Sequence, residues 1–217
     1  MEIRAGGDNN RLLSNLREAA AEAILPRLAD VPLVCGEVLR EGVYFPFSGL
    51  IAEFIFIKDR HSYTGIMGKD GALHLEYLGV PPSQVQASVL APGRAAWISA
   101  SDFRDVWGRH NAVRKMRLGY CQSRVTYARQ SAACNATHAA GPRLCTWLLH
   151  AQDCLGGDVI SITQEQVAEM LGLRRTTVNL FAQDLEKAGI IRCGRGRIQL
   201  LDRAGLEALS CGCARPE

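Results

Sequence analysis

Side chains that can bind the edges of nucleic-acid bases recur on one side of a short segment near the C-terminus. They have the spacing of a helix face and are Arg175, Thr176, Asn179 and Gln183. Arginine can donate two hydrogen bonds to a guanine edge, asparagine and glutamine suit adenine, and threonine can bond a base or touch a thymine methyl group. The pattern therefore predicts base-specific contacts with DNA.

The elements expected to position these side chains are two helices joined by a tight turn. Thr163 and Gln166 have the spacing of a capping box, so a first helix should begin near Gln164. Gly172 suits a chain reversal through a left-handed conformation. A second helix, the recognition helix, is expected over residues 174–188. Its buried stripe should consist of Val178, Phe181, Ala182 and Leu185.

A basic hairpin follows the second helix. Residues 190–192 and 197–201 can pair as strands around the turn 193–196, which contains two glycines. Residues 172–197 hold six Lys or Arg against two Asp or Glu, whereas the whole chain carries a net charge of +3. A solvated surface would explain the charge alone, but here it coincides with a winged helix-turn-helix, a motif that enters the major groove of DNA. The expected DNA contacts are Thr163, Arg174, Arg175, Thr176, Thr177, Asn179, Leu180, Gln183, Arg195 and Arg197.

The N-terminal half is expected to be a β-domain. Short apolar alternation runs through residues 33–98 and is interrupted by Gly and Pro. Residues 50–57 are rich in β-branched and aromatic side chains, and residues 63–67 and 84–90 are further strand candidates. Several short strands at regular spacing predict a sandwich or jelly roll. An amphipathic helix over residues 10–29 should cover one side.

A long helix is expected between the two halves, over residues 112–137. Two adjacent stripes run along it, and the one through Met116 and Tyr120 can pack on the β-domain. The other has heptad spacing and favours a coiled-coil-like homodimer over an ordinary core helix. Residues 137–141 then resemble a hinge, with Pro142 in the first position of the next helix. The expected dimer contacts are Leu118, Cys121, Val125, Ala128 and Ala132.

These expectations give an α+β chain with a β jelly roll over residues 1–111. A dimerisation helix and hinge over 112–138, a winged helix-turn-helix over 139–207 and a tail over 208–217 complete it. The 217 residues are 47% apolar, which is enough for a real core. With no long apolar run and no signal peptide, we expect a cytoplasmic protein without membrane contact. The eight cysteines are scattered, which predicts free thiols.

The order of these elements resembles the Crp/Fnr family of bacterial transcription regulators. The resemblance rests on ITQEQVAEMLGLRRTTV (162–178) and LEKAGIIRCGRGRIQLLD (185–202), and more loosely on VYFPFSGLIAEFIFI (43–57) and GIMGKDG (65–71). It implies a cyclic-nucleotide-binding-like sensor domain and a homodimer on a palindromic operator in double-stranded DNA, with RNA polymerase as a partner. A subgroup is marked by CNA-x-H, RRTTV and a late Cys-x-Cys.

The chain departs from the family at the base-contacting residues of the recognition helix and in the β-domain. The family commonly presents Arg, then Glu, then a second Arg five positions after the first; here Arg175, Thr176 and Leu180 stand there. The half-site should therefore differ, and Leu180 touches a thymine methyl group or belongs to the core. Residues 68–87 contain no Arg and no Gly-Glu pair, so a cyclic phosphate lacks its bidentate partner. The first cysteine, Cys35, is isolated, which argues against the N-terminal iron–sulfur cluster.

Two sets of residues could hold a metal. His74 and Glu76, with His61 on a neighbouring strand, resemble the ligands of jelly-roll (cupin) oxygenases, although solvated strand residues explain them more simply. Cys134 and His138 lie on consecutive helical turns and could bind haem or a metal. The simpler interpretation makes Cys134 a packing residue and His138 part of the hinge. We therefore assign no metal ligand and no cofactor.

The remaining cysteines suggest a thiol switch. Cys211 and Cys213 are close together near the C-terminus, while Cys193 lies in the basic hairpin. Free thiols remain the simpler interpretation. The alternative to a regulator is a metal-dependent jelly-roll (cupin-like) enzyme with an accessory winged helix. That enzyme needs a metal triad or a nucleophile–base pair with convincing spacing, so we expect a regulator and no enzymatic activity.

Overall fold

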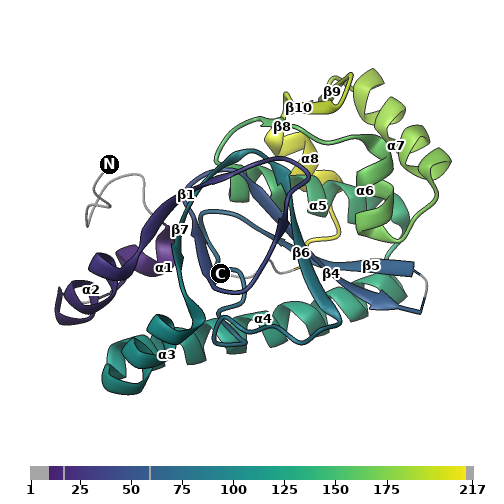
Figure 1. Cartoon of the computed structure of the whole chain (residues 1–217). Helices are drawn as coiled ribbons and strands as arrows, with labels where there is room; N and C mark the ends of the chain where they lie inside the picture. Colours follow the sequence, from purple (N-terminus) through teal and green to yellow (C-terminus); the bar gives the residue numbers. More distant parts are fainter. Residues whose placement is uncertain (1–9, 17, 59, 214–217) are drawn as a thin grey trace.

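A β-rich N-terminal half, a 27-residue helix and a helical C-terminal third follow one another along the chain. The computed structural model describes residues 10–16, 18–58 and 60–213. Figure 1 shows the long helix α4 (Asn111–Thr137) along the lower edge of the strands and the C-terminal domain at the upper right. This arrangement confirms the expected α+β fold class.

The N-terminal half is built from two antiparallel sheets. One has the strand order β1-β7-β3 and the other β2-β6-β4-β5. β4 lies between β5 and β6, and its first five residues are buried, as its run of apolar and aromatic side chains predicts. The strands are β1 (Ala29–Leu33), β2 (Val38–Leu39), β3 (Val43–Pro46), β4 (Leu50–Ile57), β5 (Arg60–Met67), β6 (Val85–Ala91) and β7 (Gly93–Ile98).

The expectation of one continuous helix over residues 10–29 is wrong. The segment contains α1 (Arg11–Ser14), α2 (Glu18–Ile24) and the 3-10 turn η1 (Leu25–Arg27), and β1 begins directly afterwards. Asn10 caps α1 and is held inside by bonds from its Nδ2 to the carbonyls of Pro46 (3.1 Å) and Gly71 (2.6 Å). These partners of Asn10 lie far away in sequence, so apolar periodicity does not reveal what holds the start of α1. A further helix, α3 (Ala100–Arg109), precedes α4.

One face of α4 packs on the β-domain, as the stripe through Met116 and Tyr120 predicts. The Tyr120 hydroxyl donates to the carbonyl of Ala72 at 2.7 Å and accepts from its amide at 3.1 Å. On the outward face, Leu118 and Val125 are more than half exposed, at 57% and 51%. The helix therefore presents an apolar stripe that the described part of the chain leaves uncovered.

A buried group of three charges joins α4 to the β-domain. Arg124 donates from Nη2 to Oε2 of Glu53 at 2.5 Å and from Nε to Oε1 of Glu76 at 3.0 Å. Burial raises the pKa of Glu53 to about 7; Arg124 opposes this shift and the charge of Glu76 adds to it. The neutral form of Glu53 is therefore favoured more in the folded protein than in the unfolded chain.

The C-terminal third is a helical domain with a small sheet. Its first helix begins two residues before Pro142, which therefore lies within the first turn and not at the first position. The expected core face of this helix, with Leu144, Trp147, Leu148 and Ala151, is buried. The elements are α5 (Ala140–Leu155), β8 (Val159–Ile160), α6 (Gln164–Leu171), α7 (Arg175–Lys187), β9 (Ile191–Gly194), β10 (Arg197–Leu200) and α8 (Arg203–Leu209).

The C-terminal domain packs directly on the β-domain. One apolar cluster contains Ala52 of β4 and Ile66 of β5 together with Leu148 of α5. A Cβ at Gly68 would overlap the Cys154 carbonyl, so the turn after β5 approaches the end of α5 at backbone distance. The two halves therefore share a core, and a shift of β4 or β5 would displace α5.

The charge group on α4 predicts a pH dependence of stability. Because folding raises the pKa of Glu53 from its ordinary value of 4.5 to about 7, the folded state binds the extra proton between these values. Stability from this group is therefore present at low pH and lost as pH rises through 7. Relative to Glu53→Gln, we expect the free energy of unfolding to fall by roughly 2 to 3 kcal/mol between pH 4 and pH 8.

Urea denaturation of both proteins across this pH range measures the difference. Glu41→Gln, at an exposed carboxylate, serves as the matched control and should follow the parent curve. Parallel curves for the parent and Glu53→Gln would contradict the assigned pKa.

Candidate DNA-binding surface

The first helix of the expected motif begins with the capping box that the sequence predicts. Thr163 Oγ1 accepts from the amide of Gln166 at 3.2 Å, and Gln166 Oε1 accepts from the amide of Thr163 at 2.9 Å. Gly172 ends α6 in the left-handed region, with φ of 63°. The turn therefore delivers the chain directly to Arg174, the N-cap of α7.

The recognition helix α7 has one buried face and one exposed face. Val178, Ala182 and Leu185 are buried, and Phe181 packs closely on Gly141 at the start of α5. Leu180 is 57% exposed, so it lies on the surface and not in the core. Most of the expected DNA contacts lie on the exposed surface, with Thr177 half-buried. The exposed ones are Thr163, Arg174, Arg175, Thr176, Asn179, Leu180, Gln183, Arg195 and Arg197.

The basic hairpin is tighter than the sequence predicts. Gly194 pairs with Arg197, so a two-residue turn of Arg195 and Gly196 replaces the expected four-residue turn. Gly196 has φ of 69°, which favours glycine there. β8 pairs with β10 and completes a three-stranded sheet that the sequence did not reveal. Glu186 of α7 accepts a 2.7 Å bond from the amide of Cys193, which ties the hairpin to the recognition helix.

A groove lies between the start of α6, the start of α7 and the hairpin. Its volume is about 330 Å³, and Thr163, Glu165, Arg175 and Arg197 are among its lining residues. Arg175 Nη1 lies 3.7 Å from Glu165 Oε2, with both side chains largely exposed. Such an exposed pair contributes little to stability, so Arg175 can leave it at low cost for a base edge.

The family comparison matches this part of the chain. Residues 142–209 fit the family model described as the Crp-like helix-turn-helix domain. The C-terminal third thus contains a Crp-like helix-turn-helix domain. No curated protein sequence matches the chain.

Solved Crp/Fnr regulators share the fold of both halves of this chain. A Crp/Fnr-family regulator from Eubacterium rectale is 18% identical and has a TM-score of 0.67, covering 92% of this chain and 97% of that one. FixK2 from Bradyrhizobium japonicum is 18% identical with a TM-score of 0.72, over 86% and 99%. A regulator from Thermus thermophilus is 20% identical with a TM-score of 0.68, over 86% and 100%. The chain thus has the fold of these regulators and carries a Crp-like helix-turn-helix domain over residues 142–209.

The histidine and glutamate residues that the sequence offers for a cupin-like metal site have other partners in the structure. His74 is buried, its Nδ1 lies 3.2 Å from the carbonyl of Gly42, and burial lowers its pKa to about 4. Glu76 pairs with Arg124. His61 packs between the rings of Phe54 and Tyr63 on the sheet. The side chains are therefore used in packing and in the charge group of α4.

Four potential metal ligands lie together beside the hinge: Cys134, His138, Cys211 and Cys213. In the sequence they form two separate pairs with no sign of contact between them. Burial raises the pKa of the Cys134 thiol to about 12. At Cys211 burial acts in the same direction, but bonds from the Thr146 hydroxyl and the Cys213 amide, among others, lower the pKa. Cys193 lies in the hairpin.

The helices of the described residues include none that is long and apolar enough to span a membrane.

Proposed function

We propose that this regulator reads DNA as a homodimer by placing α7 in the major groove. The observation that supports this most strongly is the exposed polar face of α7 beside the hairpin. Arg175, Thr176 and Asn179 would bond base edges, with Leu180 toward a thymine methyl group and Gln183 at the end of the reading face. This set differs from the usual readers of the family, so the operator half-site would differ too.

Backbone contacts would hold α7 in register. Thr163 and Arg174 stand at the starts of the two helices, where free amide groups favour a phosphate. Arg195 and Arg197 of the hairpin would contact phosphates on the other side of α7. These contacts set orientation and contribute a salt-dependent affinity, while specificity comes from the readers.

A second copy of the chain would cover the outward stripe of α4. The stripe follows heptad spacing from Leu118 to Ala132, about 22 Å of the 27-residue helix. In the single chain Leu118, Val125, Ala128 and Ala132 are exposed and Cys121 is half-buried. A two-fold axis beside α4 would present two copies of α7 to half-sites of a palindromic operator about 34 Å apart. RNA polymerase would be the partner at the promoter, in the cytoplasm.

The β-domain, residues 1–111, would change the distance between the two copies of α7. It shares the apolar cluster through Ala52, Ile66 and Leu148 with α5, and α4 and α5 are joined at His138 and Ala139. A change in the β-domain would therefore rotate the C-terminal domain about this hinge. The absence of arginine in residues 68–87 argues against a cyclic nucleotide as the signal. Since His74 and Glu76 have structural partners, a regulator is favoured over an enzyme.

Base reading by Arg175 predicts a localised loss of specificity. Selection from a random duplex library should yield a two-fold symmetric sequence with the parent protein. Arg175→Ala should relax one position in each half-site, with a loss of about 1 to 3 kcal/mol for the preferred base. Arg109→Ala, at an exposed arginine on α3, is the matched control and should leave the sequence unchanged. A uniform loss at all positions would argue against base reading by Arg175.

The dimer proposal predicts that charge on the outward stripe of α4 separates the chains. Leu118→Glu combined with Val125→Glu should convert a dimer into a monomer in sedimentation velocity, because four like charges would be buried at one seam. Val80→Glu, at an exposed apolar residue of the β-domain, should leave the dimer intact. An unchanged sedimentation coefficient in the double variant would refute the α4 interface.

A further inference from the structure

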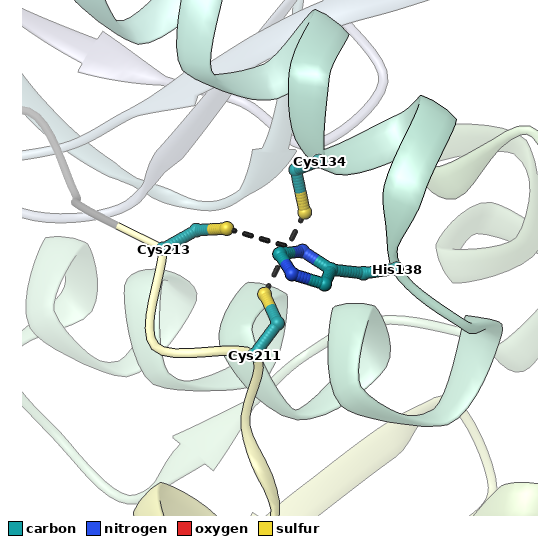
Figure 2. A group of neighbouring side chains, drawn as sticks. All are labelled: Cys134, His138, Cys211 and Cys213. Carbon is teal, nitrogen blue, oxygen red and sulfur yellow. Dashed lines mark hydrogen bonds between the residues drawn. The ribbon is translucent and has the colours of Figure 1, made fainter.

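Four side chains that commonly bind metals converge from two parts of the chain that are distant in sequence. Cys134 lies in the last turn of α4 and His138 is its C-cap, while Cys211 and Cys213 follow α8. Figure 2 shows the four side chains pointing toward one another. Their donor atoms all lie within 4.8 Å of one another. Neither the DNA-reading surface nor the dimer stripe explains this convergence.

We propose that Cys134, His138, Cys211 and Cys213 bind a single zinc ion. Three thiolates and one imidazole are a common ligand set of structural zinc sites. Zinc–ligand distances of about 2.3 Å for sulfur and about 2.05 Å for nitrogen imply tetrahedral edges of about 3.8 Å between sulfurs and about 3.6 Å between sulfur and nitrogen. The Sγ atoms of Cys134 and Cys211 are 3.5 Å apart, and Cys213 Sγ lies 3.4 Å from His138 Nδ1.

The separation of the donors favours one ion over a cluster. In a [4Fe–4S] cluster each cysteine binds a different iron, and in a [2Fe–2S] cluster two pairs of ligands bind different irons, so four ligands lie farther apart than they do around one ion. Here two donor pairs already match the edges of one tetrahedron. The spacing of Cys134 and His138, four residues apart on one helix face, is also suited to two ligands of the same ion.

A neighbouring hydroxyl supports the cysteine ligand nearest to α5. Thr146 Oγ1 lies 3.0 Å from Cys211 Sγ and accepts a 3.2 Å bond from the Cys211 amide. The amide also donates to the carbonyl of Pro142 at 3.3 Å. When Cys211 is a thiolate, the hydroxyl of Thr146 can donate to it and fix its direction. The segment after α8 is therefore held in place on α5 at the position where the ligands meet.

The site would fasten the DNA-binding domain to the dimerisation helix. One pair of ligands belongs to the end of α4 and the other follows α8, so the ion would close a loop that contains the whole winged helix. The hinge residue Ala139 lies inside that loop. This consequence rests on the proposed function: with zinc bound, the two copies of α7 keep a fixed spacing, and without it the hinge is free and operator affinity falls.

Metal content and cobalt substitution test the site without reference to DNA. The full-length parent protein and Cys35→Ser, which removes an exposed thiol elsewhere, should each carry one zinc per chain. Cys213→Ser and His138→Ala should bind zinc at least tenfold more weakly in a chelator competition. Cobalt in the parent should show the intense visible bands of a tetrahedral thiolate site, and Cys213→Ser should lose them. Circular dichroism establishes that each variant is folded.

Three outcomes would overturn the zinc proposal. The first is zinc affinity that is equal in the parent and in folded Cys213→Ser. The second is iron with acid-labile sulfide in place of zinc. The third is protein purified under reducing conditions that contains a Cys134–Cys211 disulfide and takes up no zinc after further reduction.

Operator binding by the zinc-free and zinc-loaded protein tests the coupling separately. Fluorescence anisotropy with the selected sequence should show at least tenfold tighter binding after zinc is added to the parent, with no change for Cys213→Ser. Stoichiometric zinc without any selected sequence would contradict the proposed function and leave the metal site standing. Zinc that binds without altering operator affinity would refute only the fastening role.

Discussion

The buried contact of Arg124 with Glu53 and Glu76 fixes the rotation of α4, and the rest of the arrangement depends on that rotation. Removing Arg124 would leave two largely buried carboxyl groups without their shared partner, which is strongly destabilising. Tyr120, one turn earlier, adds two bonds to the backbone of Ala72. With this face fixed inward, the stripe through Leu118 must face outward, and the end of the helix must point at the C-terminal domain.

The same helix therefore connects the three proposed properties of the protein, which are sensing, dimerisation and DNA reading. Its inward face packs on the β-domain, and its outward face is the proposed contact with a second copy of the chain. Its C-terminal end carries two of the four side chains proposed as metal ligands. The C-terminal domain touches β4 and β5 as well, through the cluster around Ala52 and Ile66. The β-domain thus contacts the C-terminal domain in two ways, through this apolar cluster and through α4. A metal at the hinge between α4 and α5 would limit how far the C-terminal domain can rotate relative to α4.

The sequence predicts what neighbouring residues determine. The capping box of Thr163 and the left-handed Gly172 act within one helical turn. The ends that the sequence predicts for α6 and α7 therefore lie within one residue of the observed ends. Long-range contacts left no such signal. The N-terminal segment starts α1 at Asn10, which distant carbonyls hold, and the cysteine cluster joins residues 77 positions apart. Cys-x3-His and Cys-x-Cys were visible separately, but only the fold brings them together.

Paired reading by two copies of α7, in successive major grooves on one face of DNA, can be tested by a hydroxyl-radical footprint on the selected operator, because the cleavage pattern reports where each strand is covered. We predict two symmetric sets of protected positions, centred about one helical turn, or about 34 Å, apart on the same side of the duplex. A single protected set, or two sets on opposite sides of the duplex, would refute paired reading by α7.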